Sequence, residues 1–338
     1  MTARIKGSTS VEALCPESWG WLAVLGERRA PREWQAAFPG PNQMVDSVTM
    51  APLELVKPTD LMERSRGRPE IKIGLVDGPV AMNHPGLATE SIREIPGGSP
   101  GRCAQLASTA CGHGTFVAGV LSGRRGSMAP AICPDCTLLV RPIFREATAE
   151  GAPLPDATPH DLAAAIVDCV EADANVVNLS LALAEASIRR ERDLDDALDY
   201  AMTRGVLIVA AAGNQGAIGS SAITRHPWVI PVAACDLQGR PVGLSNLGST
   251  IGRRGLRAPG DKITGLGAVG GSLISGGTSV AAPFVAGTIA LLWSVYPAAH
   301  ATRVKSAVTL SQLPRRTTIV PALLDAWSAY QSLLKDRP

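Results

Sequence analysis

Two apolar runs along the chain end in a polar residue beside a glycine. Residues 71–76 are rich in Ile, Leu and Val and lead into Asp77-Gly78, and residues 206–212 lead into Gly213-Asn214. Runs of this kind are typical of buried parallel strands. Functional groups gather outside the carboxyl ends of such strands, so Asp77 is placed where it can orient another group. The alternative for both polar residues is ordinary turn chemistry.

Helical patterns alternate with these predicted strands. Residues 162–169 and 192–203 have apolar positions on one face, and Gly205 follows the second of them. This alternation predicts an α/β fold, a three-layer sandwich with a mostly parallel central sheet. A chain of 338 residues can bury a substantial core. We expect a catalytic domain over 61–338 and an N-terminal extension over 1–60.

The search for a general base is short because the chain has only five His residues. His113 is flanked by Gly112 and Gly114, which allow close backbone approach, and a helical pattern follows it to about Gly123. The other four lie near prolines, turns or alanines without flanking glycines. His113 is therefore the best candidate.

Ser279 follows a glycine-rich turn and precedes an apolar helix predicted over 284–295. Backbone N–H groups and the positive dipole end at a helix N-terminus suit an oxygen whose attack creates an anion. Pro283 is expected in the first turn, where a missing N–H costs little. The alternative role for Ser279 is an ordinary N-cap. The Asn214 carboxamide could donate a hydrogen bond to the anion.

In the order Asp77, His113, Asn214 and Ser279, these residues resemble the subtilisin-like serine proteases, whose triad runs Asp, His, Ser. The resemblance spans about residue 71 to the C-terminus. It rests on Gly112-His113-Gly114-Thr115, Ala212-Gly213-Asn214, Gly277-Thr278-Ser279-Val280-Ala281-Ala282-Pro283, and lesser matches at 128–130, 177–181 and 258–260.

The resemblance implies a serine endopeptidase acting on a peptide or protein. Ser279 would be the nucleophile, His113 the base and Asp77 its orienting partner, with Asn214 in the oxyanion hole. No cofactor is required for this chemistry. Structural calcium is frequent in the family, but no acidic loop in the sequence lets us place a site. The alternative is a non-catalytic peptide-binding protein on a protease fold.

Two positions depart from the family pattern. Phe116 stands where the family usually has His, and Gly78 stands where a Ser or Thr commonly follows the Asp. The second change removes a hydroxyl near Asp77 and is expected to alter its hydrogen bonds. The stretches 75–80, 84–85 and 141–144 are similar to the proteases that mature cyanobactin-type ribosomal peptides.

Substrate contacts are expected from two segments. By the resemblance, Leu179, Ser180 and Leu181 belong to a strand that pairs with substrate backbone, and Ala212 and Gly213 line the pocket. We expect further pocket walls from the loop 223–228, which ends at Trp228. These residues are small or apolar, which favours an apolar or undemanding P1 residue. Hydrolysis and peptide ligation are not distinguished.

Composition narrows partners and location. The net charge of +2 is too small to indicate nucleic-acid binding. No signal peptide or membrane-length run is seen, so the expected location is cytoplasmic, with no membrane partner and an undetermined oligomeric state. Trp residues at 19, 21 and 34 suggest that the N-terminal segment packs on something, as a short inhibitory propeptide, a recognition element or an arm.

The seven Cys residues leave several pairings open. Cys133 and Cys136 form a CxxC, which favours plain thiols, a redox pair or a local disulfide over half of a zinc site. Cys103 and Cys111 are possible neighbours. Since Cys111 lies two residues before His113, we hypothesise that oxidation affects activity.

Overall fold

The computed structural model describes residues 11–12, 52–97, 100–146, 157–183, 191–310 and 318–335. Most of the predicted N-terminal extension lies outside these ranges, and its boundary at residue 60 stays a prediction. Leu53 and Val56 are buried in the same hydrophobic core as the rest of the described chain.

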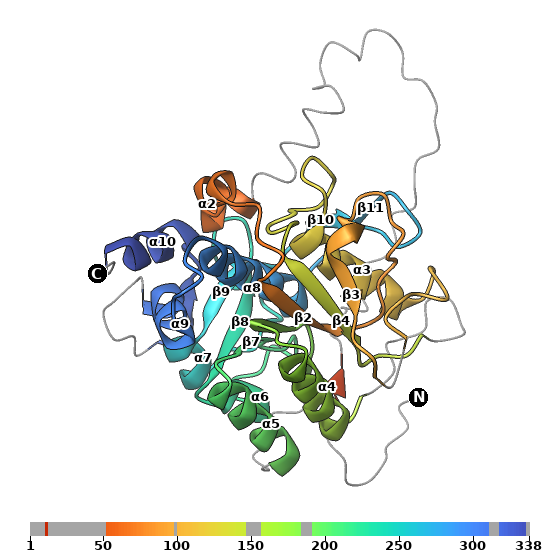
Figure 1. Ribbon diagram of the computed structural model, residues 1–338. Coiled ribbons are helices and arrows are strands. Elements are labelled where there is room, and N and C mark those ends of the chain that lie inside the picture. The colour runs from red at the N-terminus through yellow and green to blue at the C-terminus, as the bar shows by residue number, and fades with distance from the viewer. Residues whose placement is uncertain are drawn as a thin grey trace, which may run out of the picture.

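A sheet forms the centre of the molecule (Figure 1). It has eight strands, in the order β12-β9-β8-β7-β5-β2-β4-β3. Every neighbouring pair in it is parallel. The strands are β2 (Lys72–Asp77), β3 (Ile92–Glu94), β4 (Thr137–Pro142), β5 (Val176–Leu179), β7 (Leu207–Ala211), β8 (Val229–Cys235), β9 (Leu256–Pro259) and β12 (Ala322–Leu323). Their near-continuous burial explains why they read as apolar runs.

Helices cover both faces of this sheet. On one side α3 (Thr109–Ser122) and α8 (Thr278–Val295) pack together, and on the other α4 (Pro159–Glu171) packs against α5 (Arg192–Thr203) (Figure 1). Further helices in the described ranges include α2 (Thr59–Arg64), α6 (Ala222–Arg225), α7 (Ser249–Arg254), α9 (Ala301–Leu310) and α10 (Ala326–Lys335). The predicted three-layer α/β fold is confirmed.

The helix boundaries follow from local chemistry. α5 has the bounds that its periodicity predicted. α4 begins earlier than predicted because Thr158 and Asp161 form a capping box. Ser108 caps α3 by accepting a hydrogen bond from the backbone N–H of Cys111, and that helix ends before Gly123.

α8 differs from the sequence-based expectation. It begins at Thr278, six residues before the predicted start, and its N-cap is Gly277 rather than Ser279. Pro283 therefore lies inside the helix and not in its first turn. The prediction was wrong because the glycine-rich turn and Thr278 carry no apolar periodicity, so the first helical residues were read as part of the turn.

Two short antiparallel pairs stand beside the main sheet. β10 (Ile263–Leu266) pairs with β11 (Ser272–Ser275). β1 (Val11–Glu12) pairs with β6 (Ala182–Leu183), which follows shortly after β5. β6 therefore accepts an extended chain as an antiparallel partner.

Within the described ranges, one helix is long and apolar enough to cross a membrane by length and composition. This helix is α8, and 94% of it is buried inside the protein. It contacts β5, β7, β8 and β9. Its apolar composition is therefore accounted for by its place in the core.

Candidate active site

The parallel register brings three strand ends to one edge of the sheet. Val76 of β2 lies opposite Leu179 of β5, and Leu179 lies opposite Ala210 of β7. Asp77, the last residue of β2, and Asn214, which follows β7, therefore lie at the same edge. The predicted site is assembled where parallel α/β sheets hold their functional groups.

Small residues seat α3 directly on the turn after β2. A Cβ added to Gly114 would lie 2.4 Å from the carbonyl oxygen of Pro79, and one added to Gly78 would lie 2.1 Å from that of Ala110. The hydroxyl of Thr115 also accepts a hydrogen bond from the backbone N–H of Ala81. This close contact explains why glycines surround His113, and it holds the imidazole beside Asp77.

Asp77, His113 and Ser279 lie in one hydrogen-bonded row. Nδ1 of His113 is 2.7 Å from Oδ1 of Asp77, and Nε2 of His113 is 3.1 Å from Oγ of Ser279. The three residues come from β2, α3 and α8 and are 0%, 5% and 1% exposed. A hydroxyl, an imidazole and a carboxylate in this order can carry a proton from the hydroxyl to the imidazole.

Two opposing effects set the pKa of His113. Burial disfavours the charged ring and lowers its pKa, while the charge of Asp77 and the hydrogen bond to it raise the pKa. The attraction is the larger effect in sum, so the pKa of His113 lies above its ordinary value of 6.5. The ring is therefore a stronger proton acceptor than a free imidazole.

The Asp77 carboxylate is hydrogen-bonded through one oxygen. Oδ1 accepts from the backbone N–H of Gly78 at 2.6 Å as well as contacting His113. Oδ2 is buried and has no hydrogen-bond partner among the described residues. This agrees with the expectation that Gly78, in place of Ser or Thr, alters the hydrogen bonds of Asp77.

The turn after β7 is fastened to the start of α8 by two hydrogen bonds. The backbone N–H of Gly213 donates to Oγ1 of Thr278, and the backbone N–H of Thr278 donates to Oδ1 of Asn214. This hydrogen bond fixes the orientation of the Asn214 amide: its oxygen faces Thr278, and its NH2 group points away from the Thr278 N–H. A Cβ added to Gly277, whose φ is 112°, would lie 2.6 Å from Nδ2 of Asn214. Glycine at 277 therefore leaves room for the amide.

Ser279 is the second residue of α8, so its own backbone N–H has no helical acceptor. The Asn214 amide comes from the turn after β7, which the two hydrogen bonds above join to the start of this same helix.

The residues predicted to contact substrate lie at the same edge, with one exception. The side chains of Leu179, Leu181 and Ala212 are buried, which leaves the main chain of these segments as the part that a peptide could contact. The side chain of Ser180 donates a hydrogen bond to the backbone carbonyl of Ser279. The pairing of β1 with β6 lies directly after this segment.

Trp228 is the exception, and its predicted place in the pocket was wrong. Its indole N–H donates to the carbonyl of Val206, the residue that precedes β7. Trp228 itself precedes β8, so both residues lie at the amino ends of parallel strands. That is the opposite edge of the sheet from Ser279.

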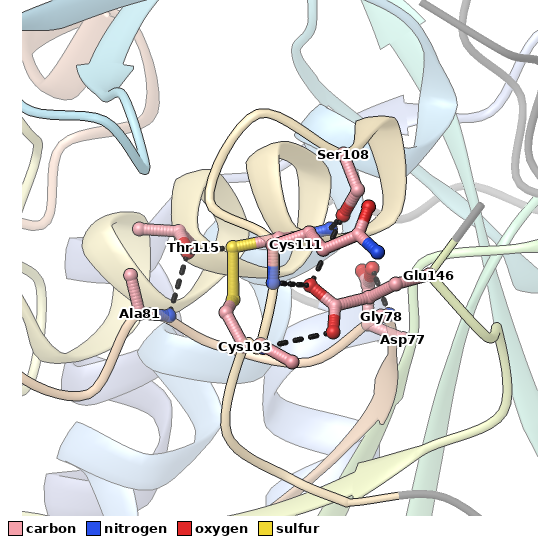
Figure 2. Close-up of a disulfide and its surroundings, with 10 residues drawn as sticks. Asp77, Gly78, Ala81, Cys103, Ser108, Cys111, Thr115 and Glu146 are labelled. Atoms are coloured by element: carbon pink, nitrogen blue, oxygen red, sulfur yellow. Dashed lines mark hydrogen bonds between the residues drawn. A yellow bond between two sulfur atoms is a disulfide. The ribbon is translucent and has the colours of Figure 1, made fainter. Parts of the chain in front are cut away.

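A disulfide between Cys103 and Cys111 ties the loop before α3 to its first turn (Figure 2). Glu146 braces the same loop. Its carboxylate accepts from the backbone N–H groups of Ala104 and Gln105 and from the hydroxyl of Ser108. Cys111 is thus bonded to Cys103 in this structure, two residues before His113. Sequence reasoning missed Glu146, which lies in no motif and meets the loop only through the fold.

The described residues contain one group of three metal-capable side chains, Cys103, Cys111 and Glu146. Two of its three atoms are the sulfurs of the disulfide, which are bonded to each other, and sulfur does not suit a hard cation such as Ca²⁺. Within the same ranges no third metal-capable side chain joins Cys133 and Cys136, which are buried free thiols. A hydrogen bond with Cys136, together with burial, raises the pKa of Cys133 well above its usual value.

Phe116, which departs from the family pattern, is buried against β10. A Cβ added to Gly265 would lie 2.6 Å from its ring. The ring therefore fills space between α3 and β10, and it is not part of the row formed by Asp77, His113 and Ser279.

Comparison with known proteins agrees with this fold. The profile of the Subtilase family matches residues 68–324. The chain is 26% identical over 263 residues to subtilisin DY of Bacillus licheniformis, covering 76% of this chain and 89% of that protein. A solved mutant of the protease domain of PatA is similar with a TM-score of 0.71 and 30% identity, over 80% of this chain and 98% of that one.

The prenylagaramide maturation protease PagA is similar in structure with a TM-score of 0.71 and 29% identity, over 81% of this chain and 98% of that one. The fold and the match to the family define a serine-type endopeptidase. The chain belongs to the subtilase family.

Proposed function

We propose that this protein is an endopeptidase in which Ser279 is the nucleophile, His113 the general base and acid, and Asp77 the orienting carboxylate. The observation that carries this proposal is the continuous row of contacts from Asp77 Oδ1 through His113 to Ser279 Oγ. The raised pKa of His113 supports its role as proton acceptor.

The reaction has two halves. Ser279 Oγ bonds to the carbonyl carbon of the substrate as its proton passes to Nε2 of His113, and the oxyanion is held by the Asn214 amide and the Ser279 backbone N–H. The C–N bond then breaks, and His113 gives the proton to the leaving amine. Water, deprotonated by His113, releases the acyl group from Ser279 and restores the enzyme. Apart from the substrate and this water, every step uses groups of this chain, and we propose that the reaction requires no cofactor.

We further propose that the substrate is a ribosomally made precursor peptide. Two relatives of similar fold, PatA and PagA, are described as maturation proteases of patellamide and prenylagaramide. The segment β6, which pairs with Val11–Glu12 as an antiparallel strand, suits an extended peptide.

This substrate class is tested with short precursor peptides encoded beside the gene, incubated with wild type and Ser279→Ala and analysed by mass spectrometry. Cleavage at one site by wild type alone supports maturation. Efficient cleavage of unrelated peptides, with the precursor left intact, contradicts it. A cyclic product in place of a linear one would assign ligation to the same nucleophile.

A further inference from the structure

The carbonyl of Ser279 lacks its usual helical partner. In an α-helix the carbonyl of one residue accepts from the N–H four residues later. Four residues after Ser279 is Pro283, which lies inside α8 and has no N–H. The peptide that carries the proposed nucleophile therefore has no α-helical donor at its carbonyl.

The hydroxyl of Ser180 supplies a donor at this point. Oγ of Ser180 lies 3.0 Å from the carbonyl oxygen of Ser279, and both residues are buried. Ser180 directly follows β5, at the edge where the site is built. The hydrogen bond that Pro283 removes from the helix is thus replaced by one from the sheet.

Asn178 fixes the direction of this hydrogen bond. Nδ2 of Asn178 donates to Oγ of Ser180 at 2.6 Å, and Asn178 is fully buried in β5. Because an amide NH2 group only donates, the Ser180 oxygen must accept, and its own hydrogen is left to point elsewhere. The hydroxyl hydrogen of Ser180 is therefore donated to the carbonyl oxygen of Ser279, which can only accept.

We propose that Ser180, oriented by Asn178, is a positioning residue for the nucleophile. The Ser180 hydroxyl replaces the hydrogen-bond donor that Pro283 lacks. It thereby holds the peptide of Ser279 in place relative to the central sheet, and not only relative to α8. This inference rests on the proposed role of Ser279. The strand that anchors the nucleophile then continues into the segment predicted to pair with substrate, so one element sets the place of both reactants.

A pair of substitutions tests this exchange directly. Ser180→Ala removes the donor, while Pro283→Ala restores an N–H at the helical position. We expect Ser180→Ala to lower kcat by about 10- to 100-fold, the cost of misplacing a reacting group, with KM nearly unchanged. Pro283→Ala alone stays near wild type because Ser180 is still present. The double variant recovers most of the lost kcat, which a merely structural role of the Ser180 hydroxyl at another partner would not produce.

Ser294→Ala is the matched control. Ser294 is a buried serine of α8. Like that of Ser180, its hydroxyl donates to a backbone carbonyl, but this carbonyl belongs to Ala290, far along the helix from Ser279. Ser180→Cys serves as a second variant in case Ser180→Ala folds poorly. It nearly keeps the side-chain volume and weakens the hydrogen-bond donor, so its kcat should lie between those of wild type and Ser180→Ala. Rates are expressed per active site, counted with a fluorophosphonate probe, so that unfolded protein does not contribute.

The outcomes separate the two proposals. If wild type is labelled and Ser180→Ala turns over as fast as Ser294→Ala, the positioning role is wrong and the proposed function stands. A double variant no faster than Ser180→Ala also overturns the positioning role. Folded wild type that is not labelled overturns both.

Discussion

Nδ1 of His113 lies 2.7 Å from Oδ1 of Asp77, and both side chains are shielded from water. In such a site the ring alone would lose its proton easily, because burial disfavours charge. The carboxylate reverses the balance and raises the pKa of His113. The pair therefore sets the pH range in which His113 can accept the proton of Ser279.

The pH profile of activity follows from this shift. His113 must be neutral to act as base, so activity is lost as pH falls through its pKa. Since that pKa is raised, the acid limb of kcat/KM has its midpoint above pH 6.5. The measurement is kcat/KM on a fluorogenic peptide from pH 5 to pH 9, and a midpoint at or below 6.5 contradicts the account.

Replacing the carboxylate should change both rate and profile. Asp77→Asn removes the charge that raises the pKa of His113, so the acid limb moves to lower pH, while kcat falls by about 10⁴ through the loss of orientation. Asp193→Asn is a suitable control, because Asp193 pairs with His160 on the exposed surface. An unchanged profile in Asp77→Asn would remove Asp77 from the proposed role.

The oxyanion donor gives a separate prediction. Asn214→Ala should lower kcat by about 10²–10³ with little change in KM, the range known for the oxyanion asparagine of a subtilisin. Asn83→Ala, at an exposed position, should leave both constants at wild-type values. Steady-state kinetics of the two variants checks this, and an equal loss in both would point to a general loss of fold.

The disulfide should stabilise the native protein. Closing the loop between Cys103 and Cys111, eight residues apart, contributes about 2.5 kcal/mol to the free energy of unfolding by the loop-entropy relation. Dithiothreitol should therefore lower the urea midpoint of wild type. The variant Cys103→Ser/Cys111→Ser should show the lower midpoint from the start and no response to the reductant. A wild type that dithiothreitol leaves unchanged would show that the disulfide carries no stability.

Much of the site could be predicted because its chemistry is local in sequence. Glycines around His113 mark the close seating of α3, and the apolar run before Asp77 marks a strand end. The order of Asp77, His113 and Ser279 then matches one family. The alternation of apolar runs and helical patterns also predicted a mostly parallel sheet. Because its strands are parallel, their carboxyl ends lie at one edge, where these residues come together.

What the sequence did not reveal depends on contacts between distant segments. The start of α8 was predicted too late because Gly277 and Thr278 have no helical pattern. Pro283 was therefore expected in the first turn, although it lies inside the helix and leaves the Ser279 carbonyl without its helical hydrogen bond. Trp228 lies at the opposite edge because it directly precedes β8, a place in the sheet that the sequence of its loop does not reveal. Glu146 could not be found, since the loop that it braces is more than 35 residues away.

The central claim is that Ser279 is the nucleophile. The most direct test is stoichiometric labelling of folded protein with a fluorophosphonate probe, read by intact mass together with kcat on a cleavable peptide. The account predicts one label on wild type, none on Ser279→Ala, and a fall in kcat of about 10⁶ in that variant, as in a subtilisin that lacks its serine. Folded wild type that takes no label, or a Ser279→Ala variant that loses less than tenfold in kcat, would contradict it.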